Sequence, residues 1–300
     1  MYLSLGLPSR IDQICFTFRG IPIQLAVKRD DLIHPLINGN KWRKLSHYLN
    51  RATEAGKNKL ISVGGAYSNH LLAMATLAKL HKFEAICYLR GNEERSKNTY
   101  EHWLMQLGAR LHYVNREIYR NKEQLYSILQ SQYPEALLIP EGGYPLPEHH
   151  APAALLDEQD LSDFSHLMLS CGTGAMLLAL AKGLRDRNSN IHLHGISAIA
   201  NFSFIHEINQ QVAAIYPFAQ LHPKPVKSRF GKLHPDMFEI TQACFHQTGI
   251  LADPIYDSAL LLHVYQGIQN ESLPNNGNLL WLHSGGQTGW AGFTSKLDEL

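Results

Sequence analysis

Two lysines lie three residues apart in a segment that is predicted to begin a helix. The apolar residues between positions 42 and 52 recur at helical spacing, so a helix should begin near Asn40. Lys41 and Lys44 then lie side by side at its amino-terminal end, beside the apolar stripe. A lysine amine can bond covalently to a carbonyl carbon, and a lysine ammonium can hold an anion. From spacing alone, both could equally be solvated helix residues.

Three predicted strand ends are followed by glycine-rich turns, at residues 64–70, 171–174 and 284–289. In open parallel sheets, ligands bind beyond the carboxyl ends of the strands, where loop amides and helix amino termini gather. Glycine allows close backbone approach, and the amides at a helix start favour an anion by about 0.3–1 kcal/mol. A phosphate group is the expected ligand, although each loop taken alone could be a turn that packs a helix on a strand.

Two common phosphate-binding motifs are incomplete or missing. The loop at 171–174 has Leu177 where a third glycine would complete the dinucleotide fingerprint, and no Gly-x4-Gly-Lys-Ser/Thr sequence occurs. These observations argue against a nicotinamide cofactor and against nucleotide hydrolysis. They leave a phosphate-bearing cofactor that has other anchors.

The composition favours a globular enzyme with a small partner. The chain has 300 residues, enough for one large α/β domain or two smaller ones. Lys and Arg number 27 against 26 Asp and Glu, without a block of five like charges, so no nucleic-acid partner is expected. The four cysteines show no CxxC spacing, which favours a reducing compartment. No apolar run approaches the ~20 residues of a membrane span and no signal pattern begins the chain, so we expect a cytoplasmic protein.

Predicted strands and helices alternate along most of the chain, which indicates βαβ units, a mostly parallel sheet and an α/β fold. The predicted strands are residues 23–29, 60–63, 85–89, 110–114, 137–139, 166–170, 191–197 and 279–283. The predicted helices are a segment from Asn40, residues 69–80, 99–107, 122–132, 151–160 and 175–184, and segments around 204–216, 236–248 and 256–267. The prolines of Pro217–Pro235 predict a long loop, which is a candidate lid.

The lysine segment belongs to a longer series of ordered motifs. Residues 28–32 (K-R-D-D-L) and 38–45 (N-G-N-K-W-R-K-L) resemble a signature of the pyridoxal-phosphate family that contains 1-aminocyclopropane-1-carboxylate deaminase and D-cysteine desulfhydrase. Further blocks match in the same order: Gly64-Gly65 with Ser68-Asn69-His70, Cys171-Gly172-Thr173-Gly174, Asp253-Pro254-Ile255-Tyr256 and His283-Ser284-Gly285-Gly286. The resemblance extends over residues 28–286, nearly the whole chain.

The resemblance implies a fold and an assembly. The fold is the tryptophan-synthase-β-like α/β fold of fold type II pyridoxal enzymes, with two open twisted mostly parallel sheets flanked by helices. Residues 1–45 and 161–300 would form a larger domain that binds pyridoxal phosphate, and residues 46–160 a smaller inserted domain. The family also implies a homodimer and a small amino-acid substrate.

The resemblance also assigns residues to the cofactor. Lys41 would hold pyridoxal phosphate as a Schiff base, Lys44 and the loop amides would bind its phosphate, and Asn69 would donate to its ring oxygen. The implied cofactor-binding residues are Lys41, Lys44, Asn69, Gly172, Thr173, Gly174 and Asp257. The other interpretation of Asn69 is that it caps the helix that follows.

The implied substrate-binding residues are Ser68, Asn69 and His70, and the implied catalytic residues are Lys41, Ser68 and Tyr256. Lys41 would move protons at the substrate carbon, and Ser68 would lie beside the substrate. Tyr256 would face the substrate and could carry a proton. A turn serine and a core tyrosine would look the same in sequence.

Departures from the family pattern leave the substrate open. The desulfhydrases usually continue with Thr-Gly-Lys after the Asp-Pro-x-Tyr block and the deaminases with Glu-Gly-Lys, whereas this chain has Asp257-Ser258-Ala259. A carboxylate against the pyridine nitrogen would favour the deaminases, but Asp257 is one methylene shorter than glutamate and could instead cap a helix. His70 resembles the desulfhydrases, and Tyr67 replaces a glutamine common to both branches.

The function implied is release of ammonia, and of sulfide where the substrate is cysteine, from a small amino acid such as D-cysteine or 1-aminocyclopropane-1-carboxylate. One alternative is a family member with lost, racemase-like or dehydratase-like activity. A second is acyl transfer by Cys171 with a histidine base. A third is a metal site at His192 and His194 or at His149 and His150, although no carboxylate or cysteine accompanies them at a metal spacing, so solvated histidines and no metal are expected.

Overall fold

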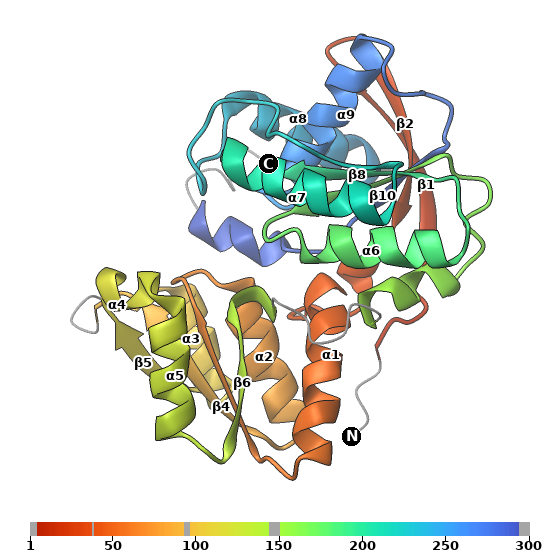
Figure 1. Ribbon diagram of the computed structural model, residues 1–300. Helices are drawn as coiled ribbons and strands as arrows, with labels where there is room; N and C mark the ends of the chain where they lie inside the picture. The colour runs from red at the N-terminus through yellow and green to blue at the C-terminus, as the bar shows by residue number, and fades with distance from the viewer. Residues whose placement is uncertain (1–4, 38, 93–96, 144–150, 294–300) are drawn as a thin grey trace. The chain divides into compact units, whose positions relative to one another are not determined.

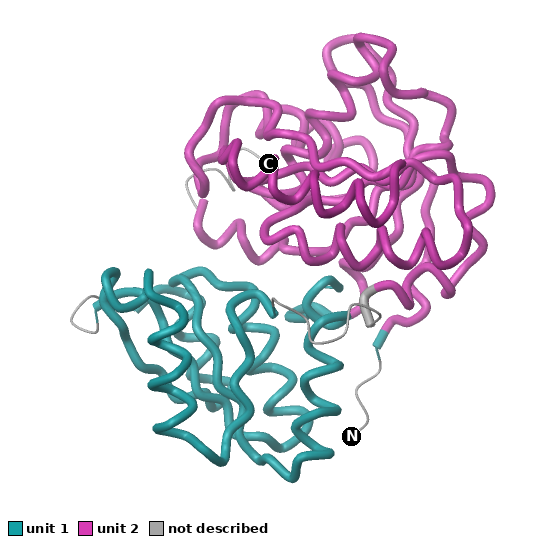
Figure 2. The backbone as a smooth tube through the Cα atoms, in the orientation of Figure 1, with its two compact units in different colours: residues 1–5, 34–146 teal, residues 6–33, 147–300 magenta. Residues whose placement is uncertain are grey.

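The chain folds into two compact units. The computed structural model describes residues 5–37, 39–92, 97–143 and 151–293 (Figure 1). The smaller unit is formed by residues 1–5 and 34–146, and the larger unit by residues 6–33 and 147–300 (Figure 2).

A four-stranded parallel sheet forms the centre of the smaller unit. Its strands are β3 (Lys59–Gly64), β4 (Glu84–Arg90), β5 (Arg110–Val114) and β6 (Ala136–Ile139), and its helices are α1 (Gly39–Glu54), α2 (Asn69–Leu80), α3 (Thr99–Gln106), α4 (Arg116–Arg120) and α5 (Lys122–Gln132). The strand order is β5-β4-β3-β6. Ile61 and Val63 of β3 form a buried cluster with Leu125 and Leu129 of α5, while α2 packs on β3 and β4. This packing places the start of α2 directly after the carboxyl end of β3, where the first glycine turn lies.

A six-stranded sheet forms the centre of the larger unit. Its strands are β1 (Ile11–Phe18), β2 (Ile21–Lys28), β7 (His166–Cys171), β8 (His192–Ser197), β9 (Ala219–His222) and β10 (Leu279–Leu282), and its helices are α6 (Ala175–Asp186), α7 (Phe202–Ile215), α8 (Pro235–Thr248) and α9 (Asp257–Gln269). The strand order is β1-β2-β10-β7-β8-β9, in which only β1 and β2 pair antiparallel among the described strands. All four residues of β10 are buried, as expected for a central strand with both faces covered.

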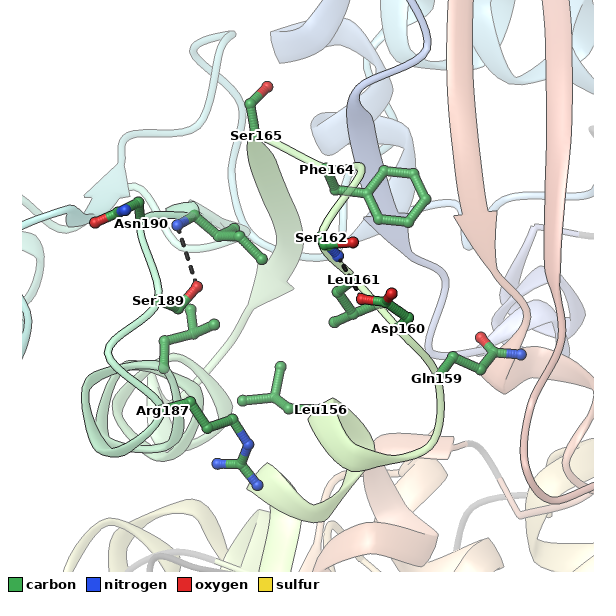
Figure 3. Close-up of a pocket in the computed structure, with 12 residues that line it drawn as sticks. Leu156, Gln159, Asp160, Leu161, Ser162, Phe164, Ser165, Arg187, Ser189 and Asn190 are labelled. Atoms are coloured by element: carbon green, nitrogen blue, oxygen red, sulfur yellow. Dashed lines mark hydrogen bonds between the residues drawn. The ribbon is translucent and has the colours of Figure 1, made fainter.

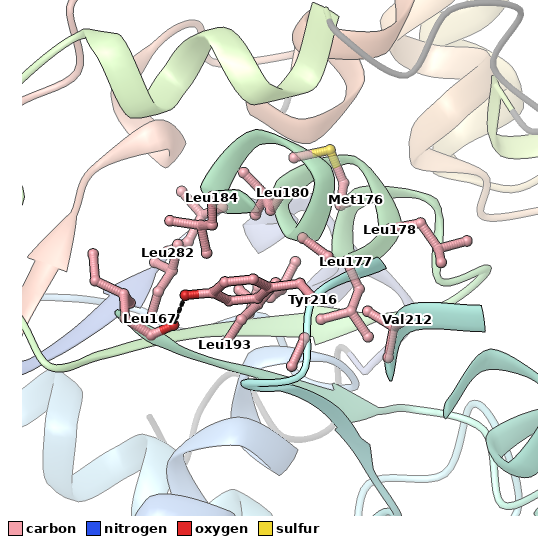
Figure 4. Packing of buried hydrophobic residues seen from close by; sticks show 14 of the residues in the cluster. Leu167, Met176, Leu177, Leu178, Leu180, Leu184, Leu193, Val212, Tyr216 and Leu282 are labelled. Atoms are coloured by element: carbon pink, nitrogen blue, oxygen red, sulfur yellow. Dashed lines mark hydrogen bonds between the residues drawn. The ribbon is translucent and has the colours of Figure 1, made fainter. Parts of the chain in front are cut away.

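Successive residues of the central strands point to opposite faces of this sheet and fill two hydrophobic clusters. Leu167 and Leu193 pack with Leu177 of α6 on one face (Figure 4). Met168, which follows Leu167, and Ile196, three residues after Leu193, point to the other face and belong to the cluster that α8 and α9 cover. The first seven residues of α6 are all buried, so the glycine loop that precedes the helix is held at the end of β7.

The boundaries of the two units differ from the expected domain division at both junctions. Helix α1 packs against α2 and β6, so residues 34–45 lie in the smaller unit and not in the larger one. The short 3₁₀ helix Ala151–Asp157 packs against α6, so this segment lies in the larger unit. It was expected as part of an α-helix over residues 151–160.

Two further strands were not expected. Strand β9 lies inside the proline-rich Pro217–Pro235 segment, because Ala219 and Leu221 are buried against the sheet and β9 pairs with β8. Strand β1 forms a hairpin with β2 through Arg19 and Gly20, both with positive φ, which suits a tight two-residue turn. Within the described ranges, no helix is both long and apolar enough to cross a membrane.

Replacement of Leu177 by alanine should destabilise the larger unit. The side chain is fully buried in the α6 cluster, so its truncation leaves a cavity that costs about 2–5 kcal/mol. The matched control is Leu80→Ala, which removes the same atoms from a side chain that is 41% exposed and should cost less than ~1 kcal/mol. Denaturant unfolding of the two variants measures both values, and equal losses would contradict the packing.

Candidate active site

Five of the ten predicted site residues lie in the smaller unit: Lys41, Lys44, Ser68, Asn69 and His70. Helix α1 carries both lysines in its first two turns. The Lys44 side chain is buried, and its Nζ donates a hydrogen bond to the Gly142 carbonyl oxygen at 3.3 Å, while Lys41 is partly exposed. Burial, followed by the positive charges of Lys41 and Lys44, lowers the pKa of His70 well below its ordinary value. The starts of α1 and α2 therefore bring two ammonium groups and a neutral imidazole into one electrostatic environment.

Ser68, and not Asn69, caps helix α2. Ser68 Oγ accepts a hydrogen bond from the Leu71 amide at 3.3 Å, and Asn69 is the first helical residue, so the interpretation of Asn69 as the cap is wrong. Asn69 Oδ1 accepts a hydrogen bond from the Tyr100 hydroxyl at 2.7 Å, and Tyr100 is completely buried. This bond turns the donor end of the Asn69 amide, Nδ2, away from Tyr100, as donation to a ligand oxygen requires.

The other five predicted residues lie in the larger unit: Gly172, Thr173, Gly174, Tyr256 and Asp257. The loop after β7 leads directly into α6, and Gly174 is the N-cap with a φ of 76°. Glycine adopts this left-handed conformation without strain. Gly174 has no side chain with which to cap this helix end, and the amides of a first helical turn can bind an anion. The backbone here fits the phosphate of a cofactor.

Tyr256 lies against the same glycine loop. A Cβ atom at Gly172 would lie 3.4 Å from the Tyr256 ring, an ordinary van der Waals distance, so the ring lies directly beside the loop backbone. The Phe230 ring packs edge-on against Tyr256, with ring centroids 6.2 Å apart. Phe230 is 57% exposed and belongs to the segment expected as a loop. The structure thus joins Tyr256 to the predicted phosphate loop and adds an aromatic neighbour.

Asp257 is buried, and both oxygens of its carboxylate accept hydrogen bonds. Ser170 Oγ donates to Oδ1, and Nδ1 of the His283 ring lies 2.7 Å from Oδ2. Nε2 of His283 lies 3.7 Å from Oδ2 of Asp31. Burial alone would lower the pKa of His283, but the hydrogen bond with Asp257 and the charges of both carboxylates outweigh it and raise that pKa. Asp257 is the first residue of α9 and not its N-cap, so the interpretation of Asp257 as a cap is wrong.

A pocket of about 530 Å³ on the larger unit contains none of the ten predicted site residues. Its lining comes from the segment before β7 and from the connection between α6 and β8, with Leu156, Phe164, Arg187 and Asn190 among the labelled residues (Figure 3). The pocket therefore lies at the amino ends of β7 and β8. The glycine loop follows the opposite end of β7, so this pocket is not the predicted cofactor site.

Cys171 and the described histidines of the alternative hypotheses lie in environments that do not favour nucleophilic attack or metal binding. Cys171 is 2% exposed within a hydrophobic cluster, which does not suit a nucleophile. His192 and His194 stack on His166, and burial lowers the pKa of His194 to about 3. No group of three metal-binding side chains occurs within the part of the chain that the structure describes. His149 and His150 lie outside the described residues.

Comparison with known proteins gives the family. The family described as pyridoxal-phosphate dependent enzyme matches residues 16–285. The chain belongs to this family. Pyridoxal phosphate is therefore its cofactor, and the glycine loop before α6 fits the phosphate of that cofactor. The enzyme class and the cofactor implied by the sequence motifs are confirmed.

Individual relatives are distant but match along most of their length. A D-cysteine desulfhydrase from Serratia proteamaculans is 21% identical over 88% of this chain and 86% of its own. A bifunctional D-cysteine desulfhydrase/1-aminocyclopropane-1-carboxylate deaminase from Arabidopsis thaliana is 21% identical over 94% of this chain and 76% of its own. The crystal structure of an ACC deaminase homologue is similar with a TM-score of 0.77 at 24% identity, covering 92% of this chain and 89% of that one. This similarity confirms the expected fold type.

Several residues of the site were not found from the sequence. Tyr100, Ser170, His283 and Phe230 each contact a predicted site residue or its neighbour. His283 lies in one of the ordered motifs, so the sequence indicated that it is near the site but not that it pairs with Asp257. The other three carry no local signal, because their roles depend on contacts with distant parts of the chain.

The His283→Gln variant should lose stability in a pH-dependent manner. The pKa of His283 is raised above 6.5 in the fold, so its protonation stabilises the protein fully below pH 6.5, and this contribution is lost as pH rises through the folded-state pKa. Glutamine keeps an amide donor but no charge. We expect a loss of about 1–3 kcal/mol below pH 6.5 and a smaller loss in alkaline solution. Unfolding in denaturant at several pH values measures it, and a loss independent of pH would show that His283 is not charged in the fold.

Proposed function

We propose that this protein is a pyridoxal-phosphate-dependent lyase that releases ammonia from a small amino acid. The observation that carries the proposal is the pair Lys41 and Lys44 at the start of α1, in a chain that matches this enzyme family over residues 16–285. The names of the relatives supply the first candidates for the substrate, 1-aminocyclopropane-1-carboxylate and D-cysteine. With cysteine and water, the products would be sulfide, ammonia and a 2-oxo acid.

Each unit carries hydrogen-bond donors or amines that match a part of the cofactor. When bound, pyridoxal phosphate supplies an aldehyde that bonds to an amine and a ring that accepts electrons from the substrate carbon. Lys41 would bond to the aldehyde, and Asn69, with Nδ2 turned away from Tyr100, would donate to the ring oxygen. Lys44 of the smaller unit and Gly172, Thr173 and Gly174 of the larger unit would each bind the phosphate.

Five side chains would contact the substrate, and Lys41, Ser68 and Tyr256 would act on it. Lys41 would remove or return a proton at the substrate carbon. Ser68 Oγ accepts the Leu71 amide, so its hydroxyl hydrogen can be donated to the substrate carboxylate. Tyr256 carries a proton at its hydroxyl oxygen, and Asn69 and His70 complete the substrate contacts on α2.

Asp257 would serve the pyridine nitrogen of the cofactor. A carboxylate there would keep the nitrogen protonated and strengthen the electron sink. Ser170 and His283 hold this buried carboxylate in one orientation through hydrogen bonds to its two oxygens, which supports the role.

The larger unit is proposed as the cofactor-binding domain, the smaller one as the domain that carries Lys41. We also propose that the protein is a cytoplasmic homodimer, as the family motifs imply. Light scattering of the purified protein gives the oligomeric state.

The Lys41→Ala variant should lose covalent attachment of the cofactor but keep part of its affinity, because the phosphate contacts remain. Borohydride reduction of the loaded protein followed by peptide mass mapping should locate the cofactor on Lys41 in the wild type. Lys79→Ala, an exposed lysine of α2, is the control and should leave the attachment unchanged. Cofactor fixed to another residue in the wild type would overturn the assignment.

The Asp257→Thr variant separates an electronic role from a structural one. If the carboxylate serves the pyridine nitrogen, threonine should slow proton removal from the substrate by tenfold or more while cofactor affinity changes little. If the only role of Asp257 is structural, through its hydrogen bonds with Ser170 and His283, the variant should lose about 3–5 kcal/mol of stability and keep its turnover per folded enzyme. Rate measurements together with thermal unfolding distinguish the two results, and unchanged kcat would exclude the electronic role.

A further inference from the structure

The segment between β9 and α8 concentrates positive charge, although the net charge of the whole chain is only +1. Residues 223–232 include no aspartate or glutamate. The basic residues of this range are Lys224, Lys227, Arg229 and Lys232. None of these four side chains forms an ion pair with a described residue, and the first carboxylates of α8, Asp236 and Glu239, pair with Arg19 instead. Repulsion between like charges destabilises such a segment, and a bound anion would relieve it.

Lys224 is the buried member of this group. It is 8% exposed, and burial lowers the pKa of its ammonium group. Its Nζ donates to Ser228 Oγ at 2.6 Å, and this is the only hydrogen bond of the side chain among the described residues. An ammonium group has three hydrogens, so two remain to be donated. Ser228 Oγ accepts from Lys224, so its own hydroxyl hydrogen is also available. An ammonium group and a hydroxyl group that donate side by side form the donor set that an oxyanion takes.

These donors lie on an anchored segment that solvent can reach. Val226 and Leu233 pack against the hydrophobic cluster that α8 and α9 cover, one on each side of Ser228 along the chain. Ser228 is partly exposed, and its neighbours Lys227 and Arg229 are exposed. A small ion can therefore reach the donors without a change in the fold.

The donors also lie at the edge of the sheet where the candidate site is found. Lys224 comes two residues after β9, the glycine loop follows β7, and β7, β8 and β9 are parallel neighbours. The carboxyl ends of parallel strands meet at one edge of a sheet, and ligands bind there. Phe230, two residues after Ser228, packs against Tyr256 beside the glycine loop. The segment that carries the donors thus contacts the candidate site directly.

The anions of the proposed function do not account for these donors. The cofactor phosphate is assigned there to the glycine loop after β7, and strand β8 separates β7 from β9. The substrate carboxylate is assigned to Ser68 of the smaller unit. A further oxyanion remains, either on the side chain of a substrate or as a free ion, and both sources present the same charged oxygens.

We propose that Lys224 and Ser228 form an oxyanion-binding site of the larger unit, separate from the glycine loop, that takes the phosphate or carboxylate group of a small molecule. The Lys224 ammonium group and the Ser228 hydroxyl group donate to its oxygens. The exposed Lys227, Arg229 and Lys232 attract it from solution. The site goes beyond the proposed function, and its binding is measured without turnover.

Binding is tested by equilibrium dialysis of the holoenzyme against inorganic phosphate at constant ionic strength. We expect one saturable site per chain besides the bound cofactor. Lys224→Met removes the charge and should weaken phosphate binding by about tenfold or more, and Ser228→Ala removes one donor and should weaken it by about threefold to tenfold. The control is Lys227→Met, which removes the same charge from an exposed position on the same segment and should change the affinity by less than about twofold.

Thermal unfolding gives a second measurement. Without phosphate, Lys224→Met should unfold at the same temperature as the wild type or higher, because it removes a mostly buried charge that has no anionic partner. Phosphate should raise the unfolding temperature of the wild type and of Lys227→Met, but not that of Lys224→Met. An equal response of all three proteins to phosphate would overturn the site.

The source of the oxyanion is distinguished with serine and O-phosphoserine, which differ only in the phosphate group. With water, O-phosphoserine would give phosphate, ammonia and a 2-oxo acid. If Lys224→Met lowers the ratio of kcat/KM for O-phosphoserine to that for serine by about tenfold, the oxyanion belongs to a substrate side chain. If phosphate binding is lost in this variant without such a change in the ratio, the site takes a free anion.

The site and the proposed function fail in different ways. Phosphate binding that Lys224→Met and Ser228→Ala leave unchanged, or that Lys227→Met weakens equally, would overturn the site and leave the proposed function intact. No ammonia from any small amino acid would overturn the proposed function, and the dialysis would still decide whether Lys224 binds an oxyanion.

Discussion

The larger unit depends on a buried ion pair between Asp257 and His283, whose side chains are no more than 1% exposed. Transfer of either charge out of water is costly, and removal of one partner from such a pair typically costs about 3–5 kcal/mol. Asp31 adds a second carboxylate beside His283, and Arg29 holds Asp31 through two hydrogen bonds of 2.8 Å. The pair is therefore not isolated but is the centre of a chain of charges of alternating sign.

This chain of charges joins the carboxyl ends of three neighbouring strands. Arg29 follows β2, His283 follows β10, and Ser170 lies near the end of β7 and donates to Asp257 at the start of α9. Strands β2, β10 and β7 are adjacent in the sheet. The residue after Ser170 is the last of β7, and the glycine loop follows it. The hydrogen bonds that satisfy the buried carboxylate therefore also fix the strand end from which the glycine loop departs.

The regular elements could largely be predicted from sequence because each carries its own periodicity, whereas β9 could not, because its four residues lie among prolines and depend on pairing with β8. The ordered motifs likewise indicated the cofactor, and they predict the residues that bind it. The side chains that orient those residues could not be predicted from the sequence, because they are distant along the chain. Tyr100 is 31 positions from Asn69, and His283 is 26 positions from Asp257. Only the tertiary fold brings them together. Prediction from sequence is also limited for adjacent residues. Ser68 and Asn69 are both good helix caps by residue type, and the backbone conformation decides which of them is the cap.

The two histidines of the ordered motifs show why residue type alone does not give the chemistry of a site. Both are buried, so desolvation lowers the pKa of each. His70 has two lysines as its charged neighbours, and these reinforce the effect of burial and keep the ring neutral. His283 has two carboxylates instead, and they reverse the effect and favour the charged ring. A neutral ring can offer a lone pair to a ligand, whereas a charged ring can only donate. Identical side chains therefore serve opposite purposes in this protein, and the difference lies in neighbours that the fold supplies.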